Sequence, residues 1–139
     1  CRGVVDQQVE DLLCAAIQVT GLISCMACGG KQAAVCHMLY GYFCDAYLPL
    51  TRRWLHGELV GASLPYQLAV NGAPQAEVQR LSAFLRRLGV PACLNDLGFE
   101  ATPQAMDALF AYLQRKMPIE TAAELARLRS YEAVLVQGA

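Results

Sequence analysis

The sequence predicts an all-α domain, a bundle of about six or seven helices. Apolar residues recur at three- and four-residue spacing along most of the chain, which is the period of an amphipathic helix. We find no convincing strand, internal repeat or low-complexity tract. Of the 139 residues, 55% are apolar and only 17% are charged. A chain of this length and composition can bury one sizeable core, so we expect a single helical domain over residues 1–139.

The first two helices are expected over Val4–Thr20 and Lys31–Ala46. Acidic residues crowd the early turns of the first, where a helix N-terminus favours negative charge. Residues 21–30 are expected to form a glycine-bounded connector. The second helix is apolar nearly all round, and we expect Leu48-Pro49 to end it. Residues 51–53 then form a short polar link.

A third helix is expected over His56–Val70, with Asn71-Gly72 closing it. Pro65 falls near its middle and should kink it. Pro74 suits the first turn of a fourth helix, where its missing N–H costs little, and Gly89 ends that helix. Its apolar face is expected to carry Val78, Leu81, Phe84, Leu85 and Leu88.

Residues 90–99 form a structured connector in this prediction. Thr102 is suited to cap a fifth helix that has Pro103 at its first position. A sixth helix is expected from Thr121 to Gly138. The core residues of the fifth helix are Met106, Leu109, Phe110 and Leu113.

The charge balance gives no electrostatic case for a nucleic-acid partner. The net charge is −1, with nine Arg and two Lys, and nothing would neutralise a row of phosphates. Leu12–Gly30 is uncharged and long enough to span a bilayer. It includes several polar residues and glycines, however, so we favour a helix buried in a larger protein over a membrane span.

Seven cysteines are present, an odd number, and most lie inside apolar segments. Reduced cysteine is found in such positions as a small hydrophobe, so we expect a reducing, cytoplasmic location. The chain opens Cys1-Arg2-Gly3 without an initiator Met or a visible signal peptide. We therefore expect a fragment or a trimmed domain.

His37 and His56 are the only histidines, and they lie 19 residues apart. Histidine is the commonest metal ligand near neutral pH. Two helices in antiparallel contact could bring these imidazoles together as part of a metal site. Spacing alone leaves two interpretations open: half of a metal site, or two ordinary core or surface histidines.

A second candidate is Cys25-x2-Cys28 followed by Cys36-His37, which has the ligand types of a structural zinc site. The spacing is poor, because adjacent helical side chains point about 100° apart and cannot easily share one metal. A redox CxxC lacks the βαβ context that it needs. We favour small residues packing a tight loop.

Three blocks of the sequence are similar to the iron-containing alcohol dehydrogenase superfamily, in the glycerol dehydrogenase branch. Leu55–Gly61 (LHGELVG), followed by a stretch ending Gln67-Leu68-Ala69, resembles the family's HGE-K-V metal-ligand helix. Gly29–Gly41 resembles its GG-L-A-A-A-H-A-I-H-N-G segment. Leu88–Gly98 resembles its GLP-x-x-L-x-D-L-G connector. The blocks fall in the family's order, and a diffuse similarity covers nearly the whole chain.

The resemblance implies the C-terminal helical metal-binding domain of a dehydroquinate synthase-like fold. His37 and His56 match the family's two ligand histidines, and the metal is zinc or iron (Zn2+ or Fe2+). These enzymes transfer a hydride between NAD or NADP and an alcohol, polyol or carbonyl substrate, with the metal as Lewis acid. Met26 matches a position near the nicotinamide, and Gly57 is expected to allow close approach beside a ligand. We also expect a homo-oligomer.

The sequence departs from the family at several positions. Tyr40 stands where a further histidine often follows the first ligand, and it cannot replace an imidazole as a proton carrier near pH 7. The family's ligand aspartate and the nucleotide-binding N-terminal domain lie upstream of the matched region, and Asp45 and Asp96 do not match that aspartate. Cys25, Cys28 and Lys31 replace the usual active-site loop residues, which puts substrate choice and activity in question.

An interpretation from a different class also stands. The excess of apolar residues fits a non-catalytic helical interaction domain, in which apolar helices form a partner surface and both histidines are structural.

Overall fold

The computed structural model describes residues 6–19, 22, 34–117 and 119–139. All regular structure in these residues is helical, with no strand among them. The backbone divides the chain into two compact units, Cys1–Gln32 and Ala33–Ala139, which are described separately. No helix in the described ranges is long and apolar enough to cross a membrane.

In the first unit, α1 spans Gln7–Leu13 and continues into a π-helical segment, η1, over Cys14–Val19. The Asp6 side chain caps α1 by accepting a hydrogen bond from the Val9 amide at 3.1 Å. Of the helix expected over Val4–Thr20, residues 7–19 are helical and Asp6 is the cap before them. Its ends, and the connector over 21–30 apart from Leu22, lie outside the described residues.

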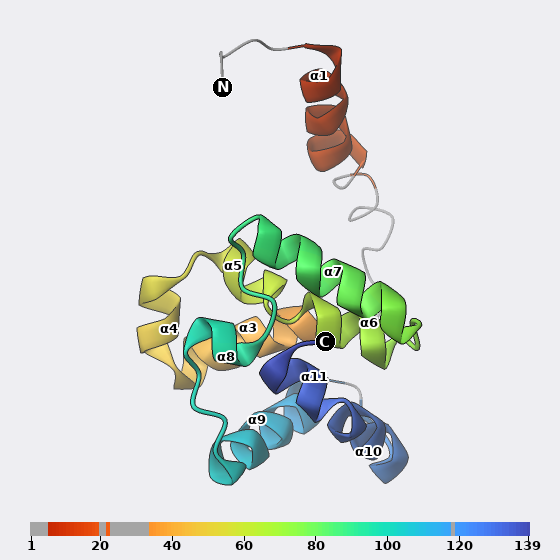
Figure 1. Ribbon diagram of the computed structural model, residues 1–139. Coiled ribbons are helices and arrows are strands. Elements are labelled where there is room, and N and C mark those ends of the chain that lie inside the picture. The colour runs from red at the N-terminus through yellow and green to blue at the C-terminus, as the bar shows by residue number, and fades with distance from the viewer. Residues whose placement is uncertain (1–5, 20–21, 23–33, 118) are drawn as a thin grey trace. The chain divides into compact units, whose positions relative to one another are not determined.

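In the second unit, α3 (Val35–Ala46) lies at the centre and contacts α4, α5, α6 and α9 (Figure 1). The apolar residues on its core face repeat over three turns, and this repeat accounts for the length of the helix. One side of α3 faces the hydrophobic core with Val35, Cys36, Leu39, Tyr42 and Phe43, all buried.

The Pro49 segment differs from the prediction. Leu48-Pro49 does not merely follow α3 but begins α4 (Leu48–Arg53), with the proline in its first turn. Proline is well tolerated there because the first amides of a helix have no partner within it. The expected polar link at 51–53 is thus the last turn of a helix.

The expected helix over His56–Val70 is two helices, α5 (His56–Gly61) and α6 (Leu64–Val70), separated by a turn at Ala62 and Ser63. Pro65 lies in the first turn of α6. A proline within a helix removes a hydrogen bond and clashes with the preceding turn, so the chain starts a new helix instead of kinking one.

Helix α7 (Gln75–Arg87) follows Pro74 and buries only part of the face expected. Its buried residues are Val78, Ser82 and Leu85, whereas Phe84 and Leu88 are 47% and 60% exposed. The prediction for Phe84 and Leu88 was wrong, because two apolar stripes share α7 and its packing against α6 buries only one of them.

The C-terminal part contains α8 (Leu94–Leu97), α9 (Pro103–Lys116), α10 (Ala122–Ser130) and α11 (Glu132–Gln137). The Thr102 hydroxyl caps α9 at the Ala105 amide, as expected. The four predicted core residues of this helix are all buried. The expected sixth helix instead divides at Tyr131 into α10 and α11.

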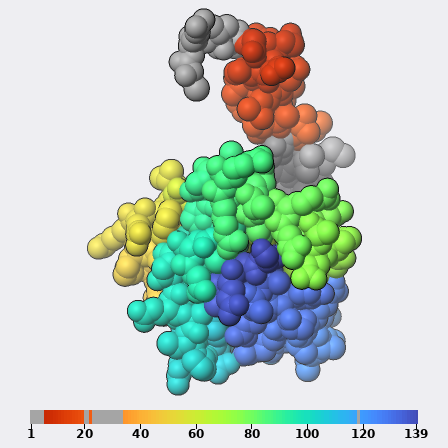
Figure 2. All heavy atoms as spheres, viewed as in Figure 1, coloured from red at the N-terminus to blue at the C-terminus, as the bar shows by residue number. Residues whose placement is uncertain are grey.

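Helix α11 contacts both α6 and α8, and Figure 2 shows its atoms seated between those two elements. Long-range hydrogen bonds tie the helices of this unit together, and two of them are donated by aromatic side chains to backbone carbonyls. The Trp54 indole donates to the Leu97 carbonyl at 3.1 Å, and the Tyr66 hydroxyl donates to the Leu128 carbonyl at 3.0 Å. The all-helical class is as predicted, with more and shorter helices than six or seven.

Candidate functional site

The two histidines lie side by side. His37 is in the first turn of α3 and His56 is the first residue of α5. Their ring centroids are 5.9 Å apart, with an angle of 50° between the ring planes. Both side chains are exposed. The contact between α3 and α5 thus presents two imidazoles together at the surface of the second unit.

Helix geometry explains why α3 offers this face. His37, Tyr40 and Cys44 are spaced i, i+3 and i+7, so they share one side of the helix, while the core residues occupy the other. The Tyr40 ring meets the His56 ring edge to face, with centroids 4.2 Å apart and planes at 87°. A hydrogen bond with Cys44 and the charge of that thiol raise the pKa of Tyr40. The three-residue spacing of His37 and Tyr40 was the sequence signal that Tyr40 lies on the same side of α3 as His37, where it contacts His56.

His56 is held at the start of α5 by its neighbours in the chain. The Glu58 carboxylate accepts a hydrogen bond from the Leu55 amide at 2.8 Å, which closes the first turn. Trp54 is fixed to the Leu97 carbonyl, and Leu59 is fully buried in the core. These contacts fix the backbone on both sides of the imidazole.

Cys36 lies behind His37 rather than beside it as a second ligand. Its side chain is only 3% exposed, and its sulfur is 3.7 Å from the His37 Nδ1 atom. Burial raises the pKa of the Cys36 thiol, although backbone N–H groups of His37 and Cys36 lower it in part. In the metal-free protein the thiol is therefore neutral near pH 7.

The donor set fits two ligands of a zinc or iron site. Two imidazoles bound to one zinc ion at a tetrahedral angle have centroids about 5 Å apart, because each metal–nitrogen bond is about 2.0 Å long. The observed separation of 5.9 Å lies within about 1 Å of that value. Within the described ranges, no three His, Cys, Asp or Glu side chains are grouped to hold a metal ion. A complete site needs a third donor from outside them.

The other predicted positions are distributed as follows. Met26, Cys25, Cys28 and Lys31 lie outside the described residues. A Cβ atom built at Gly57 meets nothing within 4 Å, so packing in the described part of the chain does not require glycine there.

Asp45 and Asp96 both have hydrogen-bond partners within the described residues. Asp45 accepts a hydrogen bond from the Tyr112 hydroxyl at 3.0 Å. Asp96 accepts one from the Ala92 amide at 3.0 Å and pairs with Arg86 at 3.2 Å. Both carboxylates tie helices and connectors together.

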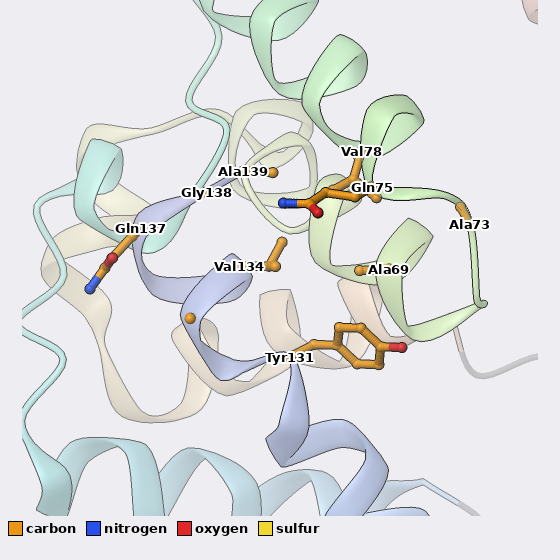
Figure 3. A pocket seen from close by; sticks show the side chains of 10 residues that line it. Ala69, Ala73, Gln75, Val78, Tyr131, Val134, Gln137, Gly138 and Ala139 are labelled. Atoms are coloured by element: carbon orange, nitrogen blue, oxygen red, sulfur yellow. The ribbon is translucent and has the colours of Figure 1, made fainter.

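A cavity of about 380 Å³ lies elsewhere, between α6, α7 and α11. Small and apolar residues such as Ala69, Val78 and Val134 line it, and Figure 3 shows the Gln75 amide extending into it while Gln137 points away. Neither histidine contributes to its lining. The cavity is therefore separate from the histidine pair.

A comparison of the chain with protein-family models, with curated proteins and with solved structures found no match.

Proposed function

We propose that this chain is the helical metal-binding part of a metal-dependent NAD(P)-linked alcohol or polyol dehydrogenase similar to glycerol dehydrogenase. The observation that carries the proposal is the exposed pair of imidazoles, 5.9 Å apart, on α3 and α5. The three sequence blocks that resemble the family include both of these histidines. The pairing also suits the chemistry, because neutral imidazole nitrogen is a good ligand for zinc and ferrous iron.

In this proposal His37 and His56 supply two of the protein ligands. A metal ion at such a site polarises the oxygen of an alcohol or carbonyl substrate as a Lewis acid. Tyr40 holds the His56 ring from the side through its edge contact, and the closed first turn of α5 fixes the backbone beneath that ring. The third ligand and the nucleotide-binding surface are proposed to lie outside the described residues.

The proposal is tested on the full-length protein that contains this chain, by elemental analysis after dialysis. We expect about one zinc or iron ion per chain in the unmodified protein. His37→Ala and His56→Ala should each abolish that binding, because a site left with two protein ligands holds metal weakly. Gln114→Ala, at an exposed position on α9, is the matched control and should bind metal normally. A full-length protein that binds neither metal nor nicotinamide dinucleotide would falsify the proposal.

A second candidate is the non-catalytic helical interaction domain. It is favoured by Phe84 on α7 and Leu88 just after its end, which lie one turn apart and are both exposed. The double variant Phe84→Ser and Leu88→Ser should abolish partner binding if this stripe is the interface. It should leave metal content unchanged if the histidine pair is the functional site. Measuring both quantities in one preparation separates the two candidates.

A further inference from the structure

The two nitrogens of the His37 imidazole have different surroundings. The His37 Nδ1 atom faces inward, 3.7 Å from the sulfur of Cys36, and that sulfur is buried while the imidazole as a whole is exposed. The ring thus has one nitrogen against the protein, and Nε2 is the nitrogen left for an external partner. The neighbouring residue in the chain sets this orientation.

The Cys36 sulfur is within hydrogen-bond distance of the inward-facing ring nitrogen, at 3.7 Å. The direction of this hydrogen bond depends on the tautomer of the ring. A neutral imidazole carries one N–H, and its other nitrogen holds a free lone pair. If Nδ1 carries the hydrogen and donates it to sulfur, the lone pair is on Nε2. That is the arrangement a metal-binding histidine needs, since its second nitrogen usually donates to a protein acceptor.

We propose that Cys36 is a positioning residue for His37, whose sulfur accepts the Nδ1–H hydrogen bond and so leaves Nε2 as the metal-binding nitrogen. The metal part of this statement rests on the proposed function, whereas the hydrogen bond and the tautomer exist in the metal-free protein. The acceptor is a thiol, where metal-bound histidines more often donate to a carboxylate, a backbone carbonyl or water.

The first experiment measures the tautomer directly in the metal-free, full-length protein. Long-range proton–nitrogen NMR spectra of protein labelled with ¹⁵N-histidine show which ring nitrogen carries hydrogen. His37→Gln and His56→Gln assign the two signals. We expect His37 in the Nδ1–H form. Cys36→Val retains an apolar side chain but removes the acceptor, and should move His37 to the Nε2–H form that free histidine prefers.

Cys36→Ser supplies a hydroxyl acceptor and should keep the Nδ1–H form, while the His56 signal should not change in any variant. An Nε2–H form of His37 in the unmodified protein would overturn the inference. So would an Nδ1–H form that persists in Cys36→Val. Because buried substitutions can unfold a protein, Cys36→Ala is the second variant, and the His56 signal reports whether the fold is retained.

The second experiment measures zinc affinity by competition with a chromophoric chelator. We expect Cys36→Val and Cys36→Ala to weaken binding by about 10- to 100-fold, and Cys36→Ser to restore it. Affinity that is equal in all four proteins would overturn the positioning role. If the unmodified protein binds neither zinc, iron nor nicotinamide dinucleotide, the proposed function fails, and the NMR result still decides the tautomer. The two failures are therefore distinguishable.

Discussion

Removing the hydroxyl of Tyr66 should destabilise the second unit by a measurable amount. Tyr66 is fully buried on α6, and its hydroxyl donates to the Leu128 carbonyl near the end of α10 at 3.0 Å. Tyr66→Phe keeps the ring and removes one donor. The buried carbonyl then loses a partner that connects two helices 62 residues apart in sequence.

The structure also bounds the magnitude. Leaving a buried polar group without a partner costs about 1–3 kcal/mol. The Leu128 carbonyl keeps a second hydrogen bond, from the Tyr131 amide at 3.3 Å, so we expect the lower part of that range, about 1–1.5 kcal/mol. For a domain of about 100 residues, each kcal/mol lowers Tm by about 4–8 °C. Chemical denaturation and thermal unfolding followed by circular dichroism measure both quantities.

Tyr42→Phe is the matched control. Tyr42 is also buried, at 4% exposure, and the contacts that it makes are those of its ring with Phe43, Tyr47 and Tyr112. This change should alter the free energy of unfolding by less than about 0.5 kcal/mol. A Tyr66→Phe variant as stable as the control would refute the reasoning, because it would show that the inter-helix hydrogen bond contributes nothing.

Tyr66 should also make the free energy of unfolding depend on pH in the alkaline range. Burial, and in smaller part the charge of Glu132, raise the pKa of Tyr66 well above its usual value of 10.0. The unfolded chain ionises near that value while the folded chain does not. Stability from this group is therefore complete below pH 10 and decreases as the pH rises above it. Tyr66→Phe should remove that part of the alkaline loss.

Two further predictions concern an acidic side chain and the glycines. Desolvation raises the pKa of Asp96, but hydrogen bonds from Ala92 and Cys93 and the charge of Arg86 outweigh it, so the net shift of the pKa is downward. The stability that this carboxylate contributes is therefore present above about pH 4 and decreases as the pH falls further. In urea titrations at several pH values, Asp96→Asn should reduce the acid-dependent loss of stability by at most about 1 kcal/mol. Gly98 ends α8 with a φ of +78°, so Gly98→Ala should cost about 1–2 kcal/mol. Gly57→Ala, at an open helical position, should be neutral or stabilising by up to about 1 kcal/mol, and equal costs at both glycines would contradict the backbone argument.

Local rules in the sequence were enough for the helical class and for several helix ends. Thr102 and Pro103 start α9 because a side-chain cap and a fixed φ act within one turn. Thr121 and Glu124 start α10 with a reciprocal capping box for the same reason. These interactions join residues three apart, so a short segment of the sequence contains both partners of each one.

Pro65 separates α5 from α6 by a local rule, but the contacts that the divided helices make were decided by packing. The turn at Ala62 and Ser63 and the break at Tyr131 place α6 and α11 in contact, and no pattern within either segment specifies that contact. On α7, the stripe with Ser82 is buried and the stripe with Phe84 is exposed. Both stripes have helical spacing, so only the position of the neighbouring helix selects between them.

The sequence by itself determined an all-helical chain with two histidines of compatible chemistry, because helical period, caps and ligand type are properties of short segments. Only the tertiary structure decided that His37 and His56 meet, that Tyr40 contacts the second imidazole, and that Cys36 lies behind the first. These contacts depend on how α5 packs against α3. That packing follows from burial of Leu59 and Leu39 in one core rather than from any local motif.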